Sequence, residues 1–234
     1  MENVVGIIPA RAGSKRIKNK NLQLLNGLPL IDYTVQFANE LNLEYCIIST
    51  DSQEIQERAF GKVSAPFLRP ENASNDTATD KAWIDHALGW LKSSLNLTPE
   101  FLFILRPTSP LRCVGLAQKA LTIARKNDLS VRSVCKIPSK HSPVWSICSN
   151  GHGFSNTFAN GFEIRSQDIP QYFFPTGIYD IIHVATYWES ENIYGDFFEI
   201  VEHPVSHIND IDTKEDLDHL NENFDTLRKI VGKY

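Results

Sequence analysis

The chain has 234 residues and a formal net charge of −5. This length accommodates one large α/β domain, and the acidic balance excludes a general nucleic-acid binder. Cys46, Cys113, Cys135 and Cys148 lack CxxC spacing, which predicts reduced and mostly buried thiols. No secretory signal opens the sequence, and no run is apolar enough to suit a bilayer, so we expect a cytoplasmic protein.

A short apolar run at residues 4–9 ends at a proline and predicts a buried strand. The loop that follows carries a set of cationic side chains: Arg11, Lys15, Arg16, Lys18 and Lys20. Small residues and cations together favour a polyphosphate ligand. Gly13 is the only glycine of the loop, so neither GxGxxG nor GxxxxGK[ST] fits it. The alternative is a solvated charged loop, and the position directly after the first strand favours a site.

The next segments alternate between helical and strand patterns. Residues 29–38 predict a helix and residues 44–51 a second strand, after which Asp51 or Ser52 caps a helix carrying Ile55, Arg58 and Ala59. Residues 79–95 have apolar side chains at helical spacing, and residues 100–105 form a continuous apolar strand. This order predicts a doubly wound, mostly parallel sheet.

The strand at 100–105 ends in a rigid cationic turn, residues 106–112, at the sheet edge where α/β proteins bind ligands. The polar run 69–79 offers further ligand contacts or helix caps. Residues 130–169 lose regular patterning, with a possible strand at 144–147, and indicate an inserted arm. Residues 177–185 return to the sheet. A last amphipathic helix is predicted on Leu217, Leu220, Phe224 and Leu227.

Asp210 and Asp212 stand two residues apart just before that helix. On an extended segment both carboxylates point the same way, which suits a hard divalent ion shared with phosphates. In the alternative interpretation, Asp212 or Thr213 caps the helix, and Glu215 or Asp216 completes a capping box. Capping leaves Asp210 unexplained.

Six motifs occur in order: IIPARAGSKR at 7–16, KN at 20–21, STDS at 49–52, RP at 69–70, RPTSPLR at 106–112 and DIDT at 210–213. Together they resemble the acylneuraminate cytidylyltransferases, also called CMP-sialic acid synthetases, and their relatives acting on bacterial nonulosonic acids. The resemblance implies a nucleotide-diphospho-sugar-transferase-like fold spanning 1–234, with a dimerisation arm at about 137–172. It also implies a homodimer and a Mg²⁺-dependent transfer of CMP from CTP to a nine-carbon α-keto acid, releasing pyrophosphate.

Residue roles follow from the resemblance by position. Expected CTP contacts are Arg11, Ser14, Lys15, Lys20, Asn21, Arg69, Ala78 and Thr79. Expected sugar contacts are Arg106, Thr108, Ser109, Arg165, Gln167 and Tyr179. Arg165 matches an arginine that meets the sugar carboxylate, within one subunit or across a dimer interface. Asp210 and Asp212 match the metal pair, and Arg11, Lys20 and Asp210 are the expected catalytic residues. The base is Asp210 or a metal-bound water.

Two departures from the sialic-acid pattern concern the sugar. Arg106 stands where those enzymes often have glutamine, and residues 175–179 read PTGIY rather than NGAIY. A legionaminic, pseudaminic or other keto-sugar acid is therefore as compatible with the sequence as sialic acid. A cytidylyltransferase for the eight-carbon acid Kdo and a non-catalytic sugar-nucleotide-binding protein are the competing hypotheses.

Overall fold

The computed structural model describes residues 3–149 and 151–232. Its main sheet has seven strands in the order β11-β7-β10-β6-β1-β4-β5. Their bounds are Val4–Pro9 (β1), Tyr45–Ser49 (β4), Val63–Ser64 (β5), Phe101–Ile104 (β6), Val131–Lys136 (β7), Phe173–His183 (β10) and Glu199–Glu202 (β11). Strand β10 runs antiparallel to β6 and β7, and the other pairs are parallel. The predicted α/β class with a mostly parallel sheet is confirmed.

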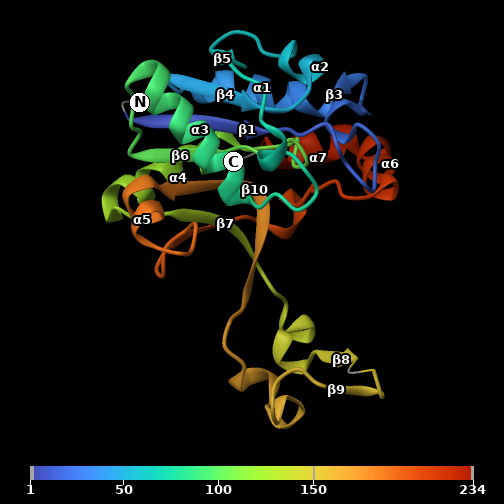
Figure 1. Cartoon of the computed structure of the whole chain (residues 1–234). Helices are drawn as coiled ribbons and strands as arrows, with labels where there is room; N and C mark the ends of the chain where they lie inside the picture. Colours follow the sequence, from blue (N-terminus) through green and yellow to red (C-terminus); the bar gives the residue numbers. More distant parts are fainter. Residues whose placement is uncertain (1–2, 150, 233–234) are drawn as a thin grey trace.

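Helices cover both faces of this sheet, which explains the continuous apolar strands (Figure 1). One face carries α1 (Leu30–Leu41), α2 (Gln53–Gln56) and α4 (Val114–Asn127); the other carries α3 (Asp80–Leu95) and α5 (Val184–Glu189). Along β1, Val4 and Ile8 pack into the first core, whereas Val5 and Ile7 pack into the second. Both faces of β1 are therefore buried, and the basic loop begins at the end of a central strand.

Helix α3 matches its predicted bounds, with Thr79 at the N-cap position. Ser52 caps α2 by accepting the Ile55 N–H at 3.3 Å, as one of the two expected caps. Helix α2 ends at Gln56, however, so the predicted extension to Arg58 and Ala59 is wrong.

The predicted last helix is two helices, α6 (Lys214–Glu222) and α7 (Phe224–Val231). Asn223 separates them: its side-chain Nδ2 donates to the His219 carbonyl at 2.9 Å, and its backbone leaves the helical region at ψ 11°. A local hydrogen bond from an asparagine side chain to a backbone carbonyl competes with the backbone hydrogen bonds of the helix. The apolar periodicity continued through Asn223 because both helices pack into the same third core, with Leu217, Leu220 and Phe224 buried.

Residues 137–172 form a small lobe that projects from the body on strands β7 and β10 (Figure 1). Its elements are 3-10 helices at Ser139–His141, Pro143–Trp145, Gly161–Glu163 and Ser166–Asp168, and the hairpin β8 (Ile147–Ser149) with β9 (Phe154–Asn156). The possible strand at 144–147 begins only at its last residue, because Pro143 starts a helical turn that Ser142 caps.

Short elements complete the description: β2 (Leu24–Leu25), β3 (Leu28–Pro29), and 3-10 helices η1 (Lys20–Leu22), η2 (Glu71–Ala73) and η7 (Val205–His207). Cys46, Cys113 and Cys135 are buried thiols, and Cys148 is exposed on the lobe. Within residues 3–149 and 151–232, no helix is both long and apolar enough to cross a membrane.

Candidate active site

A cavity of about 340 Å³ opens where β1 and β6 end. Its lining includes eight of the predicted site residues: Arg11, Ser14, Lys20, Asn21, Arg69, Ala78, Arg106 and Thr108. Segments from the basic loop, the polar run before α3 and the cationic turn after β6 thus share one wall. A second cavity of equal volume, between α1 and α7, is lined by none of the predicted site residues.

The basic loop is held in place by bonds to its own neighbours. Its first turn is tied to β4 through Ala10 N–H donating to the Ser49 carbonyl at 2.9 Å. Ala12 N–H donates to the Asp51 carboxylate at 2.7 Å, and Asn21 Nδ2 donates to the Arg11 carbonyl at 2.9 Å. Asn21 is buried, so it fixes the backbone from which the Arg11 side chain extends.

Two cations of this loop pair with Asp76, which lies between η2 and α3. Arg11 Nη1 is 3.2 Å from Asp76 Oδ1, and Lys15 Nζ is 3.0 Å from Oδ2. Arg11 also donates to the Asn75 carbonyl at 3.1 Å. The Asp76 pKa is lowered, chiefly by its hydrogen bond with Lys15. Sequence reasoning assigned Asp76 no role, because nothing local marks its pairing with a loop some sixty residues away.

Two further cations of the loop pair with Asp212, near the end of the chain. Arg16 Nη1 is 2.9 Å from Asp212 Oδ2, and Lys20 Nζ is 3.1 Å from Oδ1. Lys20 also donates to the Ile211 carbonyl at 2.9 Å, and its side chain is only 14% exposed. The first and last motifs of the sequence therefore meet at one site.

Asp210 lies beside the turn that follows β6. Ser109 Oγ is 3.5 Å from Asp210 Oδ1, and the Ile211 N–H donates to the Thr108 carbonyl at 2.8 Å. The Asp210 pKa is raised, first because protein atoms displace water and also because Asp212 repels its charge; a hydrogen bond from Thr108 opposes the rise. Asp210 thus holds a proton more readily than an ordinary aspartate does.

Asn209 clamps the aspartate segment to the turn. Its Oδ1 accepts the Leu111 N–H at 2.9 Å, and its Nδ2 donates to the Leu111 carbonyl at 2.9 Å and to the His207 carbonyl at 2.7 Å. The side chain is buried. Sequence reasoning missed this residue, whose only signal was its position immediately before Asp210.

Arg69 forms part of the inner wall. Its Nε donates to Ser49 Oγ at 2.7 Å, and its guanidinium stacks over the Trp83 ring at 5.4 Å. Burial lowers the Arg69 pKa to about 10. Within the described residues its Nη2 is buried and has no hydrogen-bond partner, and Arg69 belongs to the cavity lining.

Arg106 stands on the same wall in a carboxylate network. Its Nη2 donates to Asp80 Oδ2 at 2.7 Å and lies 4.0 Å from Asp180 Oδ2. Asp80 also accepts the Trp83 indole N–H at 2.9 Å. Burial acts to lower the Arg106 pKa, but Asp80 and Asp180 outweigh it and the pKa is raised. Arg106 therefore stays charged in a fixed orientation.

Four predicted sugar contacts do not line the cavity. Ser109 is buried beside Asp210, and the other three lie elsewhere. Arg165 and Gln167 are exposed on the projecting lobe, where Arg165 Nε pairs with Asp168 at 2.8 Å. Tyr179 is buried in the core, and its hydroxyl lies 2.9 Å from His203 Nε2. Among the CTP residues, Lys15 and Thr79 do not line the cavity: Lys15 extends into solvent and Thr79 occupies the N-cap of α3.

The chain therefore combines a mostly parallel sheet with a cation-rich loop after its first strand. The fold resembles the structure of CMP:2-keto-3-deoxy-manno-octonic acid synthetase complexed with CTP, with a TM-score of 0.69. That comparison covers 96% of this chain and 99% of the other, at 16% identity. At this identity the likeness establishes the fold.

A family model described as Cytidylyltransferase matches residues 5–87. CMP-N,N'-diacetyllegionaminic acid synthase of Legionella pneumophila is 33% identical over 91% of this chain and 92% of its own length. Pseudaminic acid cytidylyltransferase of Campylobacter jejuni is 29% identical over 91% and 92%. N-acylneuraminate cytidylyltransferase of Escherichia coli is 37% identical over 47% of this chain and 25% of its own length. The chain belongs to the cytidylyltransferase family and is of the acylneuraminate type.

Proposed function

We propose that this cytidylyltransferase transfers CMP from CTP to the anomeric hydroxyl of a nonulosonic acid. The anomeric oxygen forms a bond to the α-phosphorus of CTP, the bond from that phosphorus to the β-phosphate oxygen breaks, and pyrophosphate leaves. One observation carries the proposal: the cations of the first loop and the Asp210 and Asp212 carboxylates converge beside one cavity. The names of the relatives support a nonulosonic acid as acceptor.

Arg11, Lys15 and Lys20 are the proposed triphosphate contacts. The reaction builds negative charge on the departing pyrophosphate, and fixed cations stabilise that charge without covalent chemistry. Arg11 and Lys20 already line the cavity, and Asn21 holds the backbone of Arg11. Lys15 is 70% exposed, so we expect it to contact the outer end of the triphosphate.

The proposed pocket for the cytosine ring of CTP lies around Arg69. Its Nη2 is the kind of buried unpaired donor that a carbonyl acceptor of a pyrimidine satisfies. Asn21 and Ala78 line the same cavity. Because Arg69 is fixed by Ser49 and Trp83, the donor is in place before the nucleotide arrives.

The side chains present also fit a magnesium ion. Asp210 and Asp212 are hard oxygen donors, and Mg²⁺ is commonly held by one or two carboxylates together with substrate phosphates. Desolvation and the charge of Asp212 both raise the Asp210 pKa, and a nearby cation would relieve that strain on the ionised form. When bound, the ion would supply positive charge to the phosphates.

A second copy of the chain is the proposed partner of the lobe. Large apolar side chains stand exposed there: Ile147, Phe154, Phe158, Phe162 and Ile164. A contiguous lobe with this many uncovered apolar groups is typical of a protein interface. Arg165 and Gln167 lie on the same lobe, away from the cavity of their own chain, so a dimer offers them a route to the partner's sugar.

The direct test is pyrophosphate release from CTP and Mg²⁺ with a panel of legionaminic, pseudaminic and N-acetylneuraminic acids and Kdo. We expect release with at least one nonulosonic acid and loss of release without Mg²⁺. Asp210→Ala should abolish turnover while the circular dichroism spectrum stays native. Release with Kdo alone would reassign the acceptor, and no release with any acid would leave a binding protein.

A further inference from the structure

Asp76 contacts two side chains, Arg11 and Lys15, that are proposed to bind the triphosphate. Its two carboxylate oxygens each take one cation of the basic loop, Arg11 at 3.2 Å and Lys15 at 3.0 Å. Within residues 3–149 and 151–232, no other side chain or backbone group is bonded to this carboxylate. One anion bridging two cations is also the arrangement that a phosphate group would make with them.

The loop around Asp76 does not need this carboxylate to keep its shape. Asn75 Oδ1 accepts the Thr77 N–H at 3.1 Å and the Thr77 hydroxyl at 2.9 Å. The Ala78 N–H donates to the Asn75 carbonyl at 3.2 Å. Asp76 itself is 49% exposed and packs into none of the three apolar cores. Its contacts are therefore with the basic loop and not with its own segment.

We propose that Asp76 competes with phosphate for Arg11 and Lys15. It holds both cations while no polyphosphate is bound, yields them to the triphosphate of CTP, and takes them back as pyrophosphate leaves. The inference rests on the proposed function, because it takes these two side chains to be triphosphate contacts. Asp76 thereby limits how tightly free pyrophosphate and other small anions occupy the site.

The strength of the competitor follows from its exposure. The side chains of Lys15, Asp76 and Arg11 are 70%, 49% and 36% exposed, so water and salt screen both pairs. An exposed ion pair of this kind changes the equilibrium constant between its paired and open states by a factor of roughly two to five. For a ligand that needs both cations, the apparent Kd equals the intrinsic Kd divided by the fraction of time that Asp76 leaves the cations free. Removing its charge should tighten pyrophosphate binding by about fivefold.

The test is calorimetric titration of inorganic pyrophosphate, in EDTA, into the wild type and Asp76→Asn. We expect roughly fivefold tighter binding by the variant and a matching fall in the inhibition constant of pyrophosphate against CTP. Cytidine, which has no phosphate, should bind both proteins equally. Asp76→Ser should act in the same direction, which rules out a special effect of the new amide.

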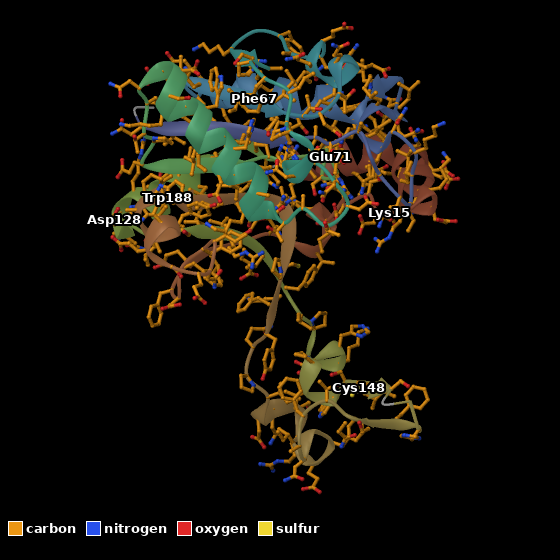
Figure 2. All side chains as sticks on the ribbon, viewed as in Figure 1. Lys15, Phe67, Glu71, Asp128, Cys148 and Trp188 are labelled. Atoms are coloured by element: carbon orange, nitrogen blue, oxygen red, sulfur yellow. The ribbon has the colours of Figure 1, made fainter. Side chains whose placement is uncertain are left out.

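Glu71→Gln is the matched control. It removes the same charge from η2, at the start of the polar segment that holds Asp76 and on the body that also carries Lys15 (Figure 2). Within the described residues the Glu71 carboxylate forms no ion pair. It should leave pyrophosphate affinity unchanged. Equal tightening by Glu71→Gln, or unchanged or weaker binding by folded Asp76→Asn and Asp76→Ser, would overturn the inference. If the wild type binds neither CTP nor pyrophosphate, the proposed function fails as well.

Discussion

Arg69, a proposed contact of the CTP pyrimidine, is held rigidly because its Nε donates to Ser49 Oγ and its guanidinium stacks over the Trp83 ring. Arg69→Lys keeps the charge but replaces the planar fork of separate donor nitrogens, one bonded to Ser49 and one left for the ligand, with a single ammonium nitrogen. We expect KM for CTP to rise by roughly tenfold or more, which corresponds to the loss of one buried donor. Cytosine and uracil share the 2-carbonyl, so steady-state kinetics should show KM rising in parallel for CTP and UTP. An unchanged KM for CTP would place the pyrimidine ring elsewhere.

His203 links pH to stability at the scale of one residue. Burial, with a smaller effect of the charge of His207, lowers the His203 pKa from 6.5 to about 4. A histidine held neutral in the fold stabilises it fully above pH 6.5, and that contribution is lost as the pH falls toward 4. The difference amounts to about 3 kcal/mol at most.

His203→Gln should therefore lose less stability than the wild type between pH 6.5 and 4, as measured by urea unfolding across that range. His141 is exposed, so His141→Gln serves as the control and should follow the wild-type profile. The buried His203 contacts the Tyr179 hydroxyl, so some loss at pH 7.5 is expected and does not affect the comparison of slopes.

At the scale of elements, Asn209 joins two loops that carry the chemistry. It bonds Leu111 twice and so sets the position of Asp210 relative to the turn after β6. Asn209→Ala leaves these buried backbone groups unpaired and should destabilise the protein by roughly 2–4 kcal/mol. We also expect kcat to fall more than KM for CTP changes. Thermal unfolding and kinetics at a temperature where the variant stays folded measure the two effects separately.

Asn209→Asp is the informative companion. The carboxylate still accepts the Leu111 N–H but cannot donate to the Leu111 and His207 carbonyls. Its stability should lie between those of Asn209→Ala and the wild type, or below both if the new charge stays buried. Wild-type kcat in Asn209→Ala would contradict a positioning role.

The elements differ in how far the sequence alone predicted them. Helix α3 and strands β1, β4 and β6 were predicted because their apolar spacing is a local property. The break at Asn223 was not predicted, because one side-chain hydrogen bond ends α6 while the apolar spacing continues into α7. The antiparallel direction of β10 and the partners of Asp76 depend on which distant segments meet, and local spacing carries no record of that.

The candidate site shows the same division. Arg11, Lys20 and Asn21 were predicted as site residues because they belong to a motif that directly follows a strand. Asp210 was predicted because helix capping does not explain it. In the structure Arg11, Lys20 and Asn21 line one cavity, and Asp210 lies beside the turn that contributes Thr108 to its lining. The supports Asn209, Asp80 and Asp76 carried no signal of their own, because an amide or a carboxylate in a polar loop is ordinary until its partner is known.

At the scale of the whole molecule, the proposed dimer depends on the exposed apolar side chains of the lobe. Phe154 is 76% exposed on β9, so Phe154→Ser costs the isolated chain little and removes apolar area from the proposed interface. We expect light scattering to show a shift from two chains toward one. Phe197, 79% exposed on the body, provides the control Phe197→Ser, which should leave the mass unchanged. A wild-type monomer would refute the dimer.

The register of β7 and β10 shows how the lobe joins the body. Lys136 and Phe173, the residues that bracket it, are direct partners across the antiparallel pair. The whole excursion of 137–172 therefore begins and ends at adjacent points of one hairpin, and a short turn is sufficient to join them. Replacing the lobe with such a turn would leave the covalent path and the strand order of the body unchanged.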